Sequence, residues 1–354
     1  MSEAEVGVGP TGHTPRSVLA VDGNALGHRA YRSAEQELLA GDDRPLVTGA
    51  VVSMLATAWV HGPYDAVLVG FDHPVNQRKL LAPEYKANRP PTPAALTASL
   101  QRLRTDLAAC GFQIVEHEGA EADDVLAATA DACTARGWRC DLLSSDRDLT
   151  ALVGDRVRLL RPRARFSELV VEDAAAVEAL YGIPAQRYVE FAALRGDTSD
   201  GLDGARGIGP KTAAKLLSTY GSLEAVYAAL PDLPPRLEAS LRAARERVER
   251  NLLLMAPVPH LDVDPDLLAT AEVRTDRVSE VLEPLGLAAA AGRFARAVTA
   301  VPAPPQAPHP VTAGGGPQAQ GRPEGSSAPQ ADLATPGTSI RRRAARTAEQ
   351  DRLF

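Results

Sequence analysis

The chain has 354 residues, of which 45% are hydrophobic and 23% are charged, with a formal net charge of −7. The composition is ordinary for a globular protein, and no apolar stretch is long enough to span a bilayer. The N-terminus has no basic segment followed by an apolar one, so it does not resemble a signal peptide. Cys110, Cys133 and Cys140 lack the spacing of a zinc site or a disulfide framework, which fits a reducing cytoplasm. The negative charge alone counts against nucleic-acid binding, unless many of the acids are gathered to hold metal ions.

The chain divides into four segments by composition. Residues 1–16 and 301–354 lack apolar periodicity, and we expect a disordered lead-in and a disordered tail rich in Pro, Gly, Ala and Gln. Residues 17–170 alternate short apolar runs with helical stretches, which predicts a parallel sheet covered on both faces. Residues 171–300 follow a helical pattern.

An aspartate follows each of three predicted strands. The pairs of strand and aspartate are Ser17–Val21 with Asp22, Ala66–Phe71 with Asp72, and Cys140–Ser144 with Asp146. The helices predicted between and after them are 49–60, 93–110 and 121–136. A single aspartate after a strand is usually a turn residue, but ligands of open α/β sheets bind beyond the carboxyl ends of the strands. We therefore expect these three carboxylates to meet in one cleft.

Further acids cluster in three short motifs. The motifs EADD, SDRD and GDTSD contribute Glu121, Asp123, Asp124, Asp146, Asp148, Asp197 and Asp200. Acids in the first turn of a helix also suit its dipole, so a capping role is open to the first motif. Because no matching set of His or Cys accompanies them, these oxygen ligands favour Mg²⁺ or Mn²⁺ over zinc. So many carboxylates could not all stay ionised without cations between them, and two metal ions are the usual solution for attack on a phosphodiester.

A glycine-rich turn follows the last acidic motif. Gly207 and Gly209 precede Pro210, which suits the first position of a helix. Such a turn exposes backbone N–H groups beside a positive helix end, and Lys211 and Lys215 lie on one face of that helix. The arrangement is typical of phosphate binding, although many helix connections look similar.

The motifs VDG, FD, EADD, SDRD, GDTSD and GIGPKTAAKLL, in this order, resemble the 5′ nuclease domain of bacterial DNA polymerase I and its stand-alone relatives. The resemblance covers roughly residues 17–300 and implies a PIN-like α/β core, a helical arch and a helix–three-turn–helix DNA-binding element. It implies that the chain is a two-metal 5′-3′ exonuclease and flap endonuclease of replication and repair. No polymerase segment follows, so we expect a stand-alone, monomeric nuclease in the cytoplasm, at the nucleoid.

The resemblance also implies roles for the acids. Asp22, Asp72 and Asp123 would serve the first metal ion, and Asp146, Asp148 and Asp197 the second, with Asp123 between the two ions. The remaining carboxylates would act through water or behind the direct ligands, and these are Glu121, Asp124 and Asp200.

Basic residues match the family's pattern as well. The stretch QRKLLAPEYKANRPPTP resembles its arch, where Arg78, Lys86 and Arg89 match basic positions and Tyr85 an aromatic one. Lys86 and Arg89 would contact the scissile phosphate, and Arg29 would lie near the first metal ion. The interval from Asp72 to Arg78 is about one residue short of the family's pattern. Gly201 and Asp203 stand where the family often has Asn and Pro.

The resemblance implies branched or nicked duplex DNA with a 5′ flap as the substrate, RNA primers as a further one, and a K⁺ ion at the glycine-rich turn. Gln350, Leu353 and Phe354 resemble the short peptide by which bacterial replication proteins dock on the sliding clamp. Two alternatives remain open: a DNA-structure-binding paralogue without catalysis, and a PIN-type ribonuclease. Absent carboxylates would indicate the first, and absence of the arch and of the helical hairpin would indicate the second.

Overall fold

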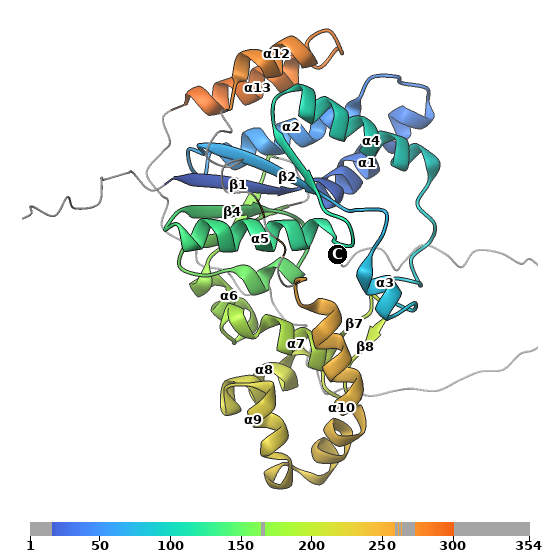
Figure 1. Ribbon diagram of the computed structural model, residues 1–354, viewed down its shortest axis with the longest axis vertical. Coiled ribbons are helices and arrows are strands. Elements are labelled where there is room, and N and C mark those ends of the chain that lie inside the picture. The colour runs from blue at the N-terminus through green and yellow to red at the C-terminus, as the bar shows by residue number, and fades with distance from the viewer. Residues whose placement is uncertain (1–15, 164–166, 259–260, 262, 264–272, 301–354) are drawn as a thin grey trace, which may run out of the picture. The chain divides into compact units, whose positions relative to one another are not determined.

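The protein was analysed as a computed structural model that describes residues 16–163, 167–258, 261, 263 and 273–300 (Figure 1). All of these belong to one compact unit, Met1–Pro305. The predicted lead-in, the tail and its clamp-like terminus lie outside the described residues. Among the residues that are described, no helix is both long and apolar enough to cross a membrane.

A six-stranded sheet forms the centre of residues 17–172. Its strands are β1 (Ser17–Asp22), β2 (Ala66–Phe71), β3 (Gln113–Glu116), β4 (Arg139–Leu143), β5 (Val157–Pro162) and β6 (Leu169–Glu172). They lie in the order β3-β2-β1-β4-β5-β6, and every neighbouring pair is parallel except β5 with β6. The chain therefore builds outward from β1 on one side and returns to add β4 on the other, so the order reverses between β1 and β4. Ligands of such sheets bind at this reversal point.

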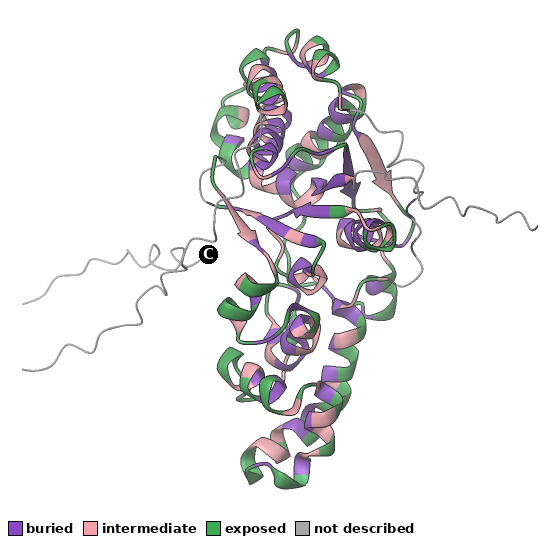
Figure 2. Ribbon diagram, turned by 90° about the vertical axis from the view of Figure 1, so that its left-hand side faces the viewer, coloured by how far each residue is buried: buried purple, intermediate pink, exposed green. Residues whose placement is uncertain are grey.

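Helices cover both faces of the sheet, as predicted from the sequence. Alternate strand residues point to opposite faces: Leu19 and Val21 join one buried cluster, while Val18 and Ala20 join another. The first cluster is completed by α1 (Gly23–Leu39), α2 (Leu46–Trp59), α4 (Ala94–Ala109), α12 (Thr275–Leu282) and α13 (Ala288–Thr299). The second is completed mainly by α5 (Ala122–Ala135), the short helix η1 (Asp148–Leu152) and α6 (Ala174–Tyr181). The three central strands β1, β2 and β4 are accordingly buried along most of their length, whereas β3 and β6 at the two edges are mostly half-buried (Figure 2).

A third buried cluster organises the helical region. Its elements are η2 (Ala185–Arg187), α7 (Tyr188–Arg195), β7 (Gly196–Asp197), β8 (Leu202–Asp203), α8 (Pro210–Tyr220), α9 (Leu223–Ala228), η3 (Leu230–Asp232) and α10 (Pro235–Met255). The hairpin of β7 and β8 is very tight, because Gly196 has φ +82° and a Cβ there would lie 2.3 Å from the backbone nitrogen of Gly204. Tyr188 and Phe191 of α7 are completely or almost completely buried in this cluster.

The predicted segments differ from the structure in which elements they contain and in how the C-terminal helices pack. The sequence patterns missed α1, β3, β5 and β6, and α2 begins at Leu46, three residues before the predicted start. In addition, α12 and α13, which we had assigned to the helical segment 171–300, pack with α2 and α4 on the sheet instead. Phe294 contacts Trp59 and Phe112 edge-to-face there, so the C-terminal helices contribute to the first core.

The segment in which we predicted a helical arch contains little helix before α4. The helix α3 (Gln77–Leu81) has five residues, and residues 82–93 form turns and extended chain. The turns are fixed to the helical region, because Ala82 and Tyr85 are buried in its cluster and the N–H of Lys86 donates to the carbonyl of Asp200 at 2.9 Å.

Candidate active site

The predicted acids gather where the strand order reverses. Asp22 is the last residue of β1, Asp72 directly follows β2, and Asp146 lies three residues after β4. Because these strands are parallel neighbours, their carboxyl ends lie at the same edge of the sheet. The expectation that the three aspartates share one region is supported by the repulsion that Asp72 and Asp146 exert on Asp22.

Asp22 is held by two short hydrogen bonds. It is buried, its Oδ1 accepts from the N–H of Ala25 at 2.8 Å, and its Oδ2 accepts from the hydroxyl of Ser144 at 2.7 Å. The same hydroxyl oxygen accepts from the N–H of Asp146 at 2.9 Å. Ser144 thus aligns the acids at the ends of β1 and β4. The sequence analysis missed this residue, although its place directly after the strand in LLSSD was a signal.

Asn24 plays a similar part for Asp72. Its amide donates to Oδ2 of Asp72 at 2.9 Å, and its carbonyl accepts from the N–H of Asp72 at 3.0 Å. Oδ1 of Asp72 accepts from the N–H of Ala122 at 2.8 Å, at the start of α5. This bond ties the end of β2 to the helix that carries the EADD motif. Asn24 also escaped the sequence analysis, although it lies two residues after Asp22.

Burial and mutual repulsion perturb the central acids. Burial, opposed by its hydrogen bonds and assisted by Asp72 and Asp146, raises the pKa of Asp22 to about 7. Burial and the charges of Asp146 and Asp22 raise the pKa of Asp123 far above its usual range. Burial, Asp146, Asp200 and Asp197 raise the pKa of Asp148 to about 8. The cluster therefore holds more negative charge than its surroundings compensate.

The GDTSD motif reaches the cluster from the helical region. Asp197 lies in β7, where its Oδ1 accepts from the N–H of Ser199 at 2.8 Å. Asp200 is buried, and its Oδ1 accepts from Arg89 at 2.5 Å. Burial raises the pKa of Asp200 although Lys86 and Arg89 oppose the shift. Both acids act on the charge of Asp148, so the two halves of the protein contribute to one electrostatic site.

Lys86 points into the acidic cluster. Its Nζ lies 2.6 Å from Oε1 of Glu121, while the hydroxyl of Tyr85 donates to Oε2 of the same carboxylate at 3.0 Å. Burial alone would lower the pKa of Lys86, but Glu121 and Asp200 hold it above its ordinary value. The reciprocal contacts keep the pKa of Glu121 below its ordinary value in spite of burial. Lys86 is therefore a fixed cation at this site, in contrast to the solvated surface lysine that is the usual alternative.

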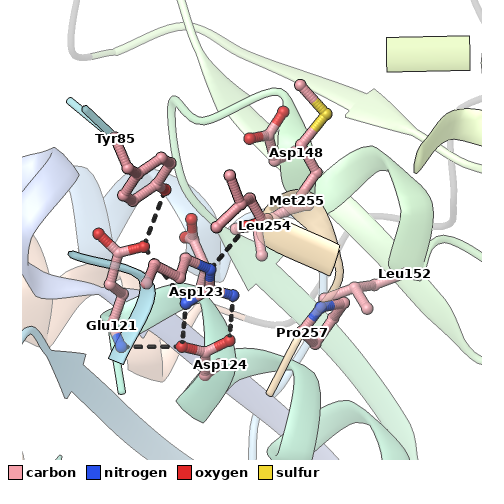
Figure 3. Close-up of a pocket in the computed structure, with 11 residues that line it drawn as sticks. Tyr85, Glu121, Asp123, Asp124, Asp148, Leu152, Leu254, Met255 and Pro257 are labelled. Carbon is pink, nitrogen blue, oxygen red and sulfur yellow. Dashed lines mark hydrogen bonds and ion pairs between the residues drawn. The ribbon is translucent and has the colours of Figure 1, made fainter. Parts of the chain in front are cut away.

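Arg78 and Asp124 form a buried pair beside this cluster. Figure 3 shows Asp124 next to Glu121 and Asp123. The two Nη atoms of Arg78 each lie 2.7 Å from one oxygen of Asp124. Arg78 also donates to the carbonyls of Leu254 at 2.7 Å and Ala256 at 2.8 Å. The carboxylate accepts in addition from the N–H groups of Glu121 and Val258, both at 2.8 Å. Both oxygens of Asp124 are thus occupied by protein donors, which is compatible with the place behind the direct ligands that the resemblance implied for it.

The remaining predicted basic and glycine residues lie away from this pair. Arg29 donates to the backbone carbonyl of Arg163. Gly207 has φ +77°, and Gly209 precedes α8 in extended conformation with Pro210 at the first helical turn. Lys211 and Lys215 are exposed on α8, and the buried Ile208 anchors the turn between the two glycines. The exposed backbone that the sequence predicted is therefore present.

Comparison with models of known protein families identifies the family of this chain. The model of the 5′-3′ exonuclease N-terminal resolvase-like domain matches residues 17–182, and that of the 5′-3′ exonuclease C-terminal SAM fold matches residues 183–276. The chain belongs to the 5′-3′ exonuclease family. The family predicted from the sequence is confirmed, and so is its fold.

Relatives of the family align over most of this chain. DNA polymerase I of Mycobacterium tuberculosis is 34% identical over 278 residues, which are 76% of this chain and 30% of that protein. The 5′-3′ exonuclease of Mycoplasma pneumoniae is 28% identical over 291 residues, 79% of this chain and 99% of that one. This chain spans less than a third of the length of the DNA polymerase I relatives that it matches. A bacteriophage T5 flap endonuclease, solved as a pseudo-enzyme-product complex with DNA and metal ions, shares the fold with a TM-score of 0.55 and 21% identity, covering 77% of this chain and 100% of that one.

Proposed function

We propose that this protein is a structure-specific 5′-3′ exonuclease and flap endonuclease, which hydrolyses DNA phosphodiesters with two divalent metal ions. The observation that carries the proposal is the set of crowded aspartates at the reversal point of the sheet, above all Asp22, Asp123 and Asp148, whose pKa values are raised. Family membership supports the reaction class. The SAM-fold match over residues 183–276 favours it over a PIN-type ribonuclease, which would lack that region.

The acidic cluster fits a hard divalent cation. Its donors are carboxylate oxygens, and adding positive charge among them would relieve the repulsion that raises their pKa values. No group of three His, Cys, Asp or Glu side chains in the described parts of the chain stands ready to hold an ion, so we expect the carboxylates to draw together on binding. The T5 complex contains metal ions, which supports the proposal that this chain binds them too. Bound Mg²⁺ or Mn²⁺ would supply positive charge to the attacked phosphate.

Asp22, Asp72 and Asp123 would hold one ion, and Asp146, Asp148 and Asp197 the other. Hydrogen bonds from Ser144 and Asn24 support two of these acids from the outer side. Such supporting contacts fix the orientation of a ligand before the ion arrives. Glu121 and Asp200 are paired with cations, so their part is to position those cations.

Lys86 and Arg89 would meet the scissile phosphate. Each now contacts a carboxylate, Lys86 with Glu121 and Arg89 with Asp200, so both are aimed at the cluster before substrate arrives. A phosphate brought to the same place would share these donors with the acids. A cation held in advance stabilises the negative charge that develops in the transition state without further reorganisation.

Arg78 and Asp124 would serve the architecture of this site instead of its chemistry. Arg78 is 6% exposed, and its guanidinium donates to Asp124 and to two carbonyls at the end of α10. This network joins α3, the start of α5 and the exit from α10. We therefore assign to the pair the task of holding the helical region against the EADD motif.

The glycine-rich turn before α8 would bind the duplex part of the substrate. Its exposed N–H groups and Lys211 and Lys215 suit phosphates, and a K⁺ ion would be coordinated by the carbonyls of such a turn. Together with the acidic cluster, this would place a branched or nicked DNA across two surfaces, with RNA primers as further substrates in replication and repair. The T5 structure is a complex with DNA.

A 5′-labelled flap duplex tests the proposal directly. Incubation with Mg²⁺ should release labelled products whose sizes map the cut near the branch, and a chelator should stop the reaction. Asp148→Asn should retain flap binding and lose cleavage, because an amide cannot supply the charge of the ligand. Flap binding without cleavage by the intact chain in either Mg²⁺ or Mn²⁺ would favour the alternative of a non-catalytic DNA-structure-binding protein.

A further inference from the structure

The loop that carries Asp146 and Asp148 is held from the neighbouring strand by one arginine. The backbone pairing of β4 with β5 ends at Leu143. Just beyond that point, the carbonyls of Ser145 and Asp146 accept hydrogen bonds from Nη1 of Arg161 on β5, at 3.1 and 3.0 Å. A side chain thus takes over from the backbone of β5 as the partner of this loop.

The same guanidinium reaches η1 and β6. Its Nη2 donates at 3.3 Å to the hydroxyl of Thr150, which is fully buried and lies two residues after Asp148 in η1. Its Nε and Nη2 donate to the two oxygens of Glu172 on β6, at 2.7 and 3.0 Å. Glu172 is buried, so the guanidinium has a fixed anchor. Arg161 therefore donates five hydrogen bonds, as many as it has N–H groups.

A salt bridge between β5 and β6 would not require this arrangement. A lysine could pair with Glu172, but its compact ammonium has only three donors and could not reach the loop and η1 as well. Burial alone would lower the pKa of Arg161, but the hydrogen bonds and charge of Glu172 hold it above its ordinary value. Because Glu172 compensates the charge, Arg161 acts on the loop through the geometry of its remaining donors.

We propose that Arg161 is a positioning residue for the second metal ion, which sets the backbone of Asp146 and Asp148 before the ion binds. The proposal rests on the proposed two-metal function and adds a residue that lies outside all of the acidic motifs. The bonds of Arg161 go to the backbone of one proposed ligand and, through Thr150, to the helix of the other. Losing an outer contact of a metal site typically lowers metal affinity or activity by about 10- to 100-fold.

The test compares two arginines of the same strand. Arg161→Lys keeps a positive charge beside Glu172 and loses the planar group that reaches the loop. Arg158→Lys is the matched control, because Arg158 donates to both oxygens of Asp141 at 2.8 and 2.5 Å and to the carbonyl of His61 at 3.2 Å. The control loses a similar set of bonds nearer the start of β5, away from the loop of Asp146.

Three measurements separate positioning from stability. Electron paramagnetic resonance of the free ion gives the Mn²⁺ affinity of each protein without DNA. Urea unfolding in the presence of a chelator gives the stability of each metal-free protein. Cleavage of a labelled flap is then followed across a range of Mn²⁺ concentrations.

Arg161→Lys should bind Mn²⁺ about tenfold more weakly than the intact protein, and about tenfold more Mn²⁺ should restore its cleavage. Arg158→Lys should keep the Mn²⁺ affinity of the intact protein, although both variants should lose stability in urea. Unchanged affinity in Arg161→Lys would overturn the inference. An equal loss of affinity in both variants would also overturn it, because the loss would then follow from a weakened β5.

Glu172→Gln provides a second test that leaves Arg161 in place. The amide has one acceptor oxygen fewer, so the anchor of the guanidinium loosens and Mn²⁺ affinity should fall severalfold. Unchanged affinity in this variant, if Arg161→Lys does not fold, would overturn the inference. Normal Mn²⁺ binding by the intact protein together with either contrary result leaves the proposed function standing. Failure of the intact protein to bind Mn²⁺ would instead refute the two-metal function, and the inference with it.

Discussion

Arg78 and Asp124 lie face to face in the interior, with both guanidinium Nη atoms 2.7 Å from the two carboxylate oxygens. The pair connects residues that are distant in the sequence, since Arg78 precedes the turns that carry Lys86 and Asp124 lies in the first turn of α5. Through Leu254 and Val258 the same network reaches the end of α10. The positions of the proposed metal-binding acids and of the helical region are thus coupled by one buried contact.

Removing one member of this pair should destabilise the protein strongly. Asp124→Asn or Arg78→Met leaves its partner buried without its counter-charge, which costs about 3–5 kcal/mol. The double variant Arg78→Met/Asp124→Leu removes both charges of the pair, so its loss should be smaller than the sum of the losses of Arg78→Met and Asp124→Leu. Urea unfolding of the intact protein, the three single variants and the double variant measures these differences. Single variants within about 1 kcal/mol of the intact protein would show that the pair contributes little.

The stability of the metal-free protein should fall as the pH rises. The pKa of Asp22 in the folded protein is about 7 and that of Asp148 about 8, against the ordinary aspartate value of 3.8 that applies to the unfolded chain. The folded state therefore holds protons that the unfolded state releases above pH 4, and stability is lost between roughly pH 4 and pH 8. Calorimetry in the presence of a chelator measures the midpoint of unfolding across this range.

Two controls follow from the same charges. Asp22→Asn should flatten the pH dependence, because an amide remains neutral at every pH in this range. Mg²⁺ should raise the unfolding midpoint more at about pH 8 than at about pH 6, since binding must displace the protons. A midpoint that rises with pH in the chelated protein would contradict the burial of uncompensated acids.

Much of this site was predictable, because an acid that directly follows a parallel strand must lie at the carboxyl edge of the sheet. Asp22, Asp72 and Asp146 required only the order of strands and the rule that carboxyl ends share an edge. The side chains that contact the acids of the site were harder to predict. Arg78 reaches Asp124 across 46 positions, and neither periodicity nor turn chemistry expresses such a contact.

The missed elements have similar causes. The strand β3 has only four residues, all half-buried, and β6 pairs antiparallel at the edge, so neither shows a long apolar run. The helix α1 begins directly at the end of β1, where the turn signal of Asp22 and Gly23 hid the helix that Asp22 caps. The packing of α13 against α2 is decided by tertiary contacts such as Phe294 with Trp59.

Lys86→Ala should lower single-turnover cleavage by about 10²-fold or more, on the scale of one lost charge-stabilising donor. Flap affinity should change much less, because Arg89 remains on Asp200. Stability should change little, since Glu121 keeps its contacts with Tyr85 and Arg78. Lys79→Ala is the matched control: it removes the same charge from exposed α3 and should leave the cleavage step intact. A loss confined to affinity would make Lys86 a binding residue only.

Substitutions at the two glycines of the turn before α8 distinguish the effect of backbone strain from the effect of blocked phosphate access. No atom lies within 4 Å of a Cβ added to Gly207 or Gly209, but Gly207 has φ +77°, where a side chain is strained. Gly209→Val should therefore fold normally and weaken duplex binding by covering the outer face of the turn, with a smaller salt dependence. Gly207→Val should in addition lower the unfolding midpoint. Binding isotherms at several salt concentrations measure the first effect, and unchanged affinity of Gly209→Val at low salt would make the turn structural.

The last prediction concerns Gln350, Leu353 and Phe354, which lie outside the described residues. Two adjacent apolar residues at the end of a long segment without apolar periodicity suit a hydrophobic pocket on a partner, and the glutamine suits a hydrogen bond at its edge. We propose the replication sliding clamp as that partner. Deleting Leu353 and Phe354 should abolish clamp binding in titration calorimetry and any stimulation by the clamp, because tethering acts through local concentration. Cleavage of a free flap should stay unchanged, since the deletion leaves Asp22, Lys86 and their neighbours intact. Equal clamp binding by the intact and shortened proteins would refute the tether and leave the nuclease assignment untouched.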